Sequence, residues 1–242
     1  PMTLGQEFEA YRTTIKEDMQ RIHELVRLFQ EINLGATAIG TGITANPEYA
    51  SLAVEELSRI SGIDFEVAED LVEATSDTGS FVMFSSVLKR FAVKISKMCN
   101  DLRLLSSGPR AGLNEINLPA VAPGSSIMPG KVNPVIPEVV NQVAYQVIGN
   151  DQAVTMAAEA GQLQLNVMEP VIAFNILQSI KMLTQSVTTL THRCIRGITA
   201  NAEQCRKYVD CSIGIVTALN PYIGYENSSR IASKALQTGR GV

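Results

Sequence analysis

Apolar residues recur every three or four positions along most of the chain, which is the spacing of one face of an α-helix. Several runs of this pattern are longer than an ordinary globular helix. After Gly197 the runs become shorter, which indicates the opening of a second, smaller helical domain. The fold class predicted is all-α, a bundle of very long helices. Helices are expected at residues 4–34, 47–60, 77–105, 134–160, 165–195, 202–210 and 228–237, with NPYIGYENSS as a turn before the last of them.

Helical spacing stops between the predicted helices at 77–105 and 134–160, in a stretch at residues 107–133 that is rich in proline and glycine. An irregular segment of this length inside a compact domain is uncommon and usually carries function. We therefore expect the chemistry of the protein to reside in this loop.

Some of the predicted helices are apolar on more than one face. The helix at 77–105 carries Val82, Met83 and Val93 in addition to its main stripe. A helix that is apolar all round must be buried all round. We expect this burial to come from association with identical chains, and burial within one thick monomer is the alternative.

Composition and charge exclude several classes of protein. The chain has 242 residues, of which 45% are hydrophobic, and its net charge is −4. These values exclude a disordered polymer, and without a concentrated basic face we expect no nucleic-acid partner. No apolar run reaches the ~18 residues that a bilayer span needs. Four acidic residues within the first twenty argue against a signal peptide, so we expect a cytoplasmic protein with no membrane partner.

Cysteine and histidine usage argues against a disulfide framework or a metal centre. None of the four cysteines forms a C-x-x-C pair, and the chain has only two histidines. A catalytic zinc ion would need a cluster of ligands that this set does not supply. We expect reduced cysteines, no metal and no cofactor.

Residues 124–133, GSSIMPGKVN, contain the most distinctive group of side chains in the loop. Two adjacent hydroxyls, two glycines and Lys131 lie together just before a helix. Backbone N–H groups in such a turn can converge on an anion, and Lys131 adds a positive charge, so a carboxylate is the natural ligand. A solvated loop with an incidental lysine remains the alternative from these residues alone.

The same segment, with Pro134, resembles the signature of the aspartase/fumarase superfamily, G-S-S-x-M-P-x-K-x-N. GATAIGTG at 35–42, SGPRAG at 107–112 and LNVMEP at 165–170 resemble further landmarks of that superfamily in the same order. The resemblance covers practically the whole chain. It implies the central helical bundle domain at 1–198 and the start of the C-terminal domain at 199–242. It also implies a fragment, because members are longer and carry an N-terminal domain and a threonine-containing motif upstream.

The resemblance implies a lyase that removes a proton and a leaving group from adjacent carbons of a succinyl compound and releases fumarate. VIPEVVNQV at 135–143 and AEAGQLQLNVMEPVI at 158–172 resemble the branch that acts on aspartate. The implied reaction is elimination of ammonia from L-aspartate to give fumarate through a carbanion. The alternatives are a fumarate hydratase of the same superfamily, whose first stretch typically runs T-Q-x-E-A, and a non-catalytic helical core. A homotetramer with active sites shared among subunits is also implied.

Residue roles follow from the same resemblance. It implies Ser125 as the general base, with Ser126 and Lys131 binding the substrate. Asn133 belongs to the substrate-binding group and is expected to brace the exit of the loop. We expect Arg110 and Asn114 to steady the loop without touching the substrate.

The remaining signature residues are expected to support these groups. Backbone amides of Ile127 and Met128 would stabilise a serine alkoxide, and Gly124 and Gly130 would act as hinges for closure. Glu138 either pairs with a polar partner from the upstream motif or is a structural acid at a helix start.

Overall fold

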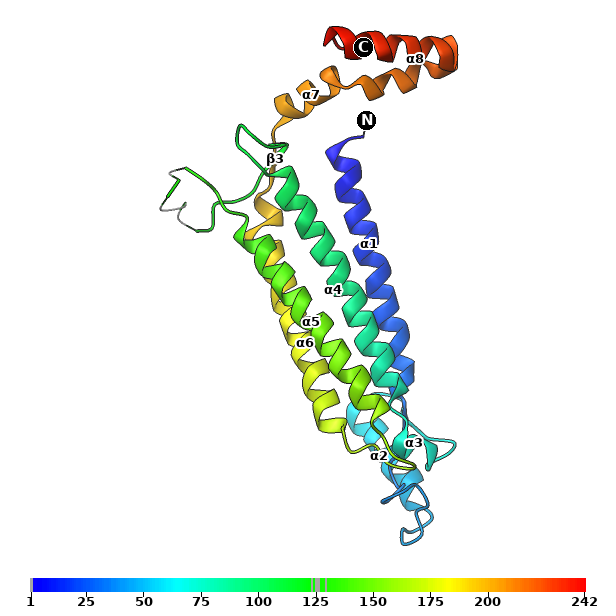
Figure 1. The fold of residues 1–242 in the computed structure, drawn as a ribbon. Coiled ribbons are helices and arrows are strands. Elements are labelled where there is room, and N and C mark those ends of the chain that lie inside the picture. The colour runs from blue at the N-terminus through cyan, green and yellow to red at the C-terminus, as the bar shows by residue number, and fades with distance from the viewer. Residues whose placement is uncertain (1, 123, 125–126, 129) are drawn as a thin grey trace. The chain divides into compact units, whose positions relative to one another are not determined.

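A computed structural model describes residues 2–122, 124, 127–128 and 130–242 and shows a predominantly helical chain (Figure 1). The described helices lie close to the predicted runs, which confirms the expected all-α fold. Among the described residues, none of these helices combines the length and hydropathy needed to cross a membrane. The α-helices are α1 (Leu4–Glu24), α2 (Tyr49–Ser61), α3 (Glu73–Ser76), α4 (Gly79–Leu105), α5 (Val135–Glu159), α6 (Glu169–Arg193), α7 (Ala202–Cys211) and α8 (Asn220–Thr238).

Short strands and 3-10 helices connect the long helices, and periodicity did not predict them. Strand β1 (Glu31–Ile32) pairs in parallel with β2 (Glu66–Val67), and β3 (Ile116–Asn117) pairs antiparallel with β4 (Thr199–Ala200). Two-residue strands are too short to show an alternating pattern. The 3-10 helices are η1 (Leu25–Phe29), η2 (Ile195–Gly197) and η3 (Ile213–Leu219).

The chain forms two compact units, and each is described by itself. The helical unit comprises residues 12–99 and 138–189, and the loop unit comprises residues 1–11, 100–137 and 190–242. The predicted boundary between a central and a C-terminal domain, at residue 198, remains a prediction about the longer protein.

Within the helical unit, parts of α1, α4, α5 and α6 run side by side around an apolar core (Figure 1). Spacing of three and four residues brings the apolar positions of each helix onto the face that its neighbours cover. Fully or almost fully buried members of this core include Ala92, Ile95, Cys99, Val140, Ala144, Val147, Val154, Ile172 and Leu183.

Polar side chains inside the helical unit are paired with one another across the helices. Asn150 on α5 donates through Nδ2 to Ser179 Oγ on α6 at 3.0 Å. Ser85 on α4 donates to Asp151 Oδ1 on α5 at 2.8 Å, and Lys89 forms an ion pair with the same carboxylate. Because a buried polar group without a partner is unfavourable, these pairs favour one alignment of the helices over others.

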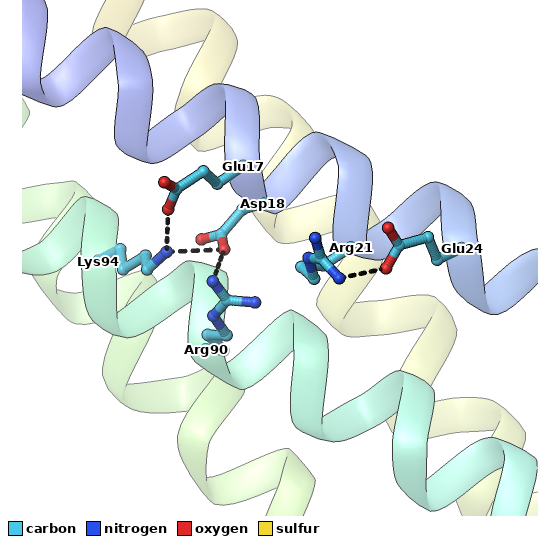
Figure 2. A network of polar contacts seen from close by, with 6 residues as sticks. All are labelled: Glu17, Asp18, Arg21, Glu24, Arg90 and Lys94. Atoms are coloured by element: carbon cyan, nitrogen blue, oxygen red, sulfur yellow. Dashed lines mark hydrogen bonds and ion pairs between the residues drawn. The ribbon is translucent and has the colours of Figure 1, made fainter.

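A second ionic contact joins α1 to α4 (Figure 2). Asp18 is completely buried, and its Oδ1 lies 3.0 Å from Arg90 Nη2 and 2.8 Å from Lys94 Nζ. Lys94 also lies 4.0 Å from Glu17 Oε2. The two cations on α4 thus compensate the carboxylate that α1 buries.

The predicted helix at 4–34 is too long. The α-helix ends at Glu24, and after η1 the chain becomes extended. Gln30 O accepts from Glu66 N at 2.8 Å and Ile32 O accepts from Ala68 N at 3.0 Å. Backbone pairing with a distant segment therefore replaces the helical hydrogen bonds that the apolar spacing implied.

The predicted turn NPYIGYENSS is largely helical. Helix α8 starts at Asn220, with Pro221 in its first turn, where a missing N–H is tolerated. The only departure within α8 is Gly224, whose φ of 79° lies in the left-handed region that glycine adopts readily. One residue thus supplies the kink that the whole segment was expected to form.

The apolar faces singled out in the sequence are not covered by this chain. Met83 remains 54% exposed and Val93 50% exposed. Burial by identical chains and burial within one thick monomer of the longer protein both stay predictions.

We expect Asp18→Ala to lower the free energy of unfolding by about 2–3 kcal/mol, because it removes the buried anion that Arg90 and Lys94 share and leaves only the more distant Glu17 beside Lys94. The matched control is Glu24→Ala, which removes an exposed pair with Arg21 (Figure 2) and should change it by less than about 1 kcal/mol. Urea unfolding with comparison of midpoints measures both. Equal losses for the two variants would contradict the role given to Asp18.

Candidate functional site

The signature loop, residues 107–133, connects α4 to α5 within the loop unit. Ser125 and Ser126, the predicted base and one predicted substrate-binding residue, lie outside the described residues. Five residues with a predicted role at the tip of the loop are described, and all are exposed: Gly124, Ile127, Met128, Gly130 and Lys131.

The tip of the loop folds back on itself. Lys131 N donates to Met128 O at 3.3 Å, and Gly130 has a φ of 80°. A Cβ on Gly124 would lie 3.0 Å from the carbonyl oxygen of Lys131. The two glycines therefore allow the flanks of the tip to approach each other, and Lys131 lies where they meet.

The chain enters the loop through a tight turn, the segment SGPRAG at 107–112. Ser107 O accepts from Asn114 N at 2.8 Å, and Ser107 Oγ accepts from Leu113 N at 3.1 Å. A Cβ on Gly112 would lie 2.4 Å from the carbonyl carbon of Ser107, so only glycine fits there. Arg110 is exposed at this turn, and the hydrogen bond from Asn114 N closes it.

The chain leaves the loop through Asn133 and Pro134, both half-buried. Val135 N donates to Asn133 O at 2.8 Å, which gives a three-residue turn directly before α5. Asn133, Pro134, Leu118 and Pro119 border one narrow gap with Cys194 at the end of α6. The two stems of the loop, residues 114–122 and 133–137, therefore meet over the end of α6.

Glu138 lies in the first turn of α5 and is half-buried. An acid at this position is favoured by the positive end of the helix dipole. One turn on, buried Asn141 donates to Ser96 O at 3.0 Å and to Ser96 Oγ at 2.8 Å. This pair fixes the first turns of α5 against α4 within the helical unit.

Sequence reasoning missed the polar contacts that hold the entering stem. The side chain of Asn201, just after β4, bonds to both Asn114 and Asn117. Thr199 accepts a further hydrogen bond from Asn117 at 3.1 Å. The only signal in the sequence was the asparagine content of two distant segments, which no spacing rule connects.

A cavity of about 750 Å³ lies elsewhere in the loop unit. Tyr11 OH donates to Asp101 Oδ2 at 2.8 Å in its wall, and burial together with this carboxylate raises the pKa of Tyr11. The described residues of the stretch 124–133 do not line this cavity. Glu115 of the entering stem does line it, so the cavity borders the base of the loop and not its tip.

The part of the chain that the structure describes holds no group of three or more histidine, cysteine, aspartate or glutamate side chains placed to bind a metal ion. All four cysteines are described, and each is a free thiol, as expected.

Comparison with known families gives two matches. A family described as "Lyase" matches residues 1–149, and one described as "Fumarase C C-terminus" matches residues 215–242. Together they include the helices α1 to α4, the whole signature loop and all of α8.

Curated proteins similar to this chain include aspartate ammonia-lyases. That of Pseudomonas canavaninivorans is 67% identical and that of Escherichia coli K12 is 60% identical, each over 100% of this chain. The match takes in 51% of each of those proteins. The chain therefore spans about half the length of the curated relatives it matches.

Solved structures are similar as well. The fumarate lyase:delta crystallin of Brucella melitensis bound to cobalt superposes with a TM-score of 0.96 at 60% identity, over 100% of this chain and 52% of that one. The class II fumarase of Schistosoma mansoni gives 0.93 at 34% identity, over 100% of this chain and 53% of that one. These likenesses extend to the whole described fold.

The burial of Cys194, which borders the gap between the two stems, predicts a low reactivity of its thiol. Cys194 is 1% exposed, and burial raises the pKa of its thiol to about 11. At about pH 8, only about one such thiol in a thousand is the reactive thiolate. We expect slow alkylation of Cys194 that accelerates as the pH rises towards 11, measured by peptide mass spectrometry. The control is the same protein in denaturing urea, and equal rates in both conditions would show that Cys194 is not covered.

Proposed function

Because this chain belongs to the lyase family matched over residues 1–149, we propose that it is part of an enzyme that eliminates ammonia from L-aspartate to give fumarate. The observation that carries the proposal is the identity of 60–67% with aspartate ammonia-lyases across the entire chain. The signature loop lies inside this region of identity. No metal or other cofactor enters the proposal.

The chemical difficulty of this elimination is the proton on Cβ of aspartate. Removing it places a second negative charge on the neighbouring carboxylate, giving an aci-carboxylate. Catalysis must therefore supply donors and positive charge that are in place before the reaction. In the proposal, the hydroxyl of Ser125 acts as the base. An ordinary serine is too weak for this role, so its alkoxide needs stabilisation by backbone N–H groups, for which Ile127 and Met128 are candidates.

Lys131 and Ser126 are proposed to hold a carboxylate of the substrate. The exposed position of Lys131 at the tip, beside the close approach of Gly124, supports this role. Asn133 is set back in the leaving stem and borders the gap at Cys194. This placement favours the bracing role for Asn133 over contact with the substrate.

Glu138 and the two loop glycines are proposed as supporting residues. Gly130, with a positive φ, is a candidate hinge for closure of the tip over the substrate. Glu138, in the first turn of α5, is positioned to stabilise a polar partner that another part of the protein supplies.

We also propose that the enzyme is a homotetramer whose active sites are shared among subunits. The support is a set of large apolar side chains on α5 and α6 that the helical unit leaves exposed. Large apolar side chains that stay exposed on two neighbouring helices favour an interaction site. Members of the set include Tyr145, Met156, Val171, Phe174 and Leu177.

In the full-length enzyme, Ser125→Ala should reduce kcat for fumarate formation by about 10²–10⁴-fold, because the proton acceptor is lost. Aspartate binding should change little, since the substrate contacts remain. Ultraviolet absorbance of fumarate measures the rate, and Ser61→Ala on α2 is the control that should keep full activity. Unchanged turnover in Ser125→Ala would reject its role as the base.

Two further outcomes decide between the alternatives. Fumarate appearing from malate and not from aspartate would replace the ammonia-lyase by a fumarate hydratase. If the full-length protein acts on neither compound, the alternative of a non-catalytic helical core holds.

For the assembly, we expect Phe174→Glu to shift the full-length protein from tetramer to smaller species in sedimentation velocity. A charge placed on a buried apolar face without a partner opposes association. Lys207→Glu, which changes an exposed charge on α7 of the loop unit, should remain a tetramer. If the Phe174→Glu variant forms a tetramer as stable as that of the parent, the subunit interface lies elsewhere.

A further inference from the structure

We propose that Asn201 is a positioning residue for the signature loop, which it acts on by holding the entering stem, residues 114–122. The inference rests on the proposed function, because it concerns the same loop. Asn201 belongs to none of the motifs that carry the resemblance, and it lies far downstream of the loop in the chain.

The side chain of Asn201 forms the centre of a hydrogen-bond network. Its Nδ2 donates to Asn114 O at 2.9 Å, to Asn114 Oδ1 at 3.1 Å and to Asn117 Oδ1 at 3.1 Å. Its Oδ1 accepts from Asn117 Nδ2 at 2.6 Å. The side-chain amide thus uses both its donor and its acceptor on the entering stem.

The backbone of Asn201 adds a further contact to the same stem. Its N–H donates to Glu115 O at 2.8 Å, next to the β3–β4 pairing. A two-stranded sheet of two residues per strand has little stability of its own. The side-chain network of Asn201 therefore contributes much of what fixes residues 114–117 in place.

The conformation of Asn201 indicates that this network takes precedence over helix capping. Asn201 is the residue before α7, and asparagine at this position usually accepts a hydrogen bond from its own helix. Here the side chain makes no such bond. It is directed to the loop stem, and the first turn of α7 lacks the usual side-chain cap.

The entering stem needs an external hold because its backbone is unfavourable at Asn114. The φ of this residue is 51°, in the left-handed region that non-glycine residues adopt only when the surroundings fix it. Hydrogen bonds from Asn201 to both the carbonyl and the side chain of Asn114 supply that constraint.

The segment that leads to Asn201, residues 193–201, also contacts the rest of the loop base. A Cβ on Gly197 would lie 2.5 Å from Pro119 Cγ, so the entering stem packs directly against this glycine. Cys194 borders the gap that Asn133 and Pro134 of the leaving stem also line. One segment thus touches both stems, and Asn201 is its hydrogen-bonding end.

Displacement of the stems would move the tip that carries Ser125 and Lys131. Catalysis depends on position to within about 1 Å, where a misplacement lowers the rate by about 10²-fold. Binding of a carboxylate by a lysine tolerates more displacement, because it is a charge interaction with a long side chain. A positioning residue should therefore affect kcat more than KM.

The test uses the full-length enzyme with Asn201→Ala and, as the matched control, Asn227→Ala. Asn227 is an exposed asparagine on α8 whose Nδ2 donates only to Ile223 O of its own helix among the contacts described. We expect Asn201→Ala to lower kcat by about 10–100-fold while KM for aspartate changes by less than about threefold. Asn227→Ala should match the parent in both.

Two further measurements keep the outcome decisive. Asn201→Asp retains the acceptor for Asn117 but places a carboxylate oxygen against Asn114 O, so its kcat should be no higher than that of Asn201→Ala. Hydrogen exchange of residues 114–122 should accelerate in Asn201→Ala and not in Asn227→Ala. If Asn201→Ala does not fold, the test uses Gly197→Ala, whose new methyl group would displace Pro119 of the entering stem. We expect the same fall in kcat and the same faster hydrogen exchange of residues 114–122.

A folded Asn201→Ala enzyme with the parent's kcat and stem exchange would overturn the proposal. A fall in kcat together with a similar rise in KM and a loss of thermal stability would also overturn it, because a merely structural role produces that combination. The proposed function fails separately, if the parent enzyme does not act on aspartate. In that case, hydrogen exchange of residues 114–122 in Asn201→Ala still tests whether Asn201 holds the entering stem.

Discussion

Both ends of a long irregular loop must have their backbone polar groups satisfied before the loop can present side chains in a defined place. The described part of the signature loop has no long strand or helix of its own to do this. Its entering stem is held by the turn at Ser107 and by the asparagines at 114, 117 and 201, and its leaving stem continues into α5. We infer that the placement of Lys131 depends on these contacts at the two stems.

The long helices supply the frame to which the loop is attached. In the helical unit, apolar packing brings α1, α4, α5 and α6 together, but apolar contacts alone allow several alignments. The buried pairs Asp18 with Lys94, Asp151 with Ser85 and Asn141 with Ser96 select among them. The last pair lies close to the start of α5, where the loop ends.

Sequence periodicity predicted α4, α5 and α6 to within a few residues, because their burial patterns repeat over many turns. It failed where a single contact decides the structure. The chain after Glu24 leaves the α-helix to pair with residues 66–68, and Gly224 alone kinks α8. The signature residues were found through resemblance, since the local residues alone also fitted a solvated loop. Asn201 was missed because its partners are distant in sequence, and Ser125 and Ser126 lie outside the described residues.

The most direct test of the central claim is a crystal structure of the full-length lyase with a bound dicarboxylate. The account requires a carboxylate group of the ligand within ion-pair distance of Lys131 Nζ and the Ser125 hydroxyl facing the carbon that loses its proton. A dicarboxylate bound at another place, with Lys131 directed into solvent, would contradict it.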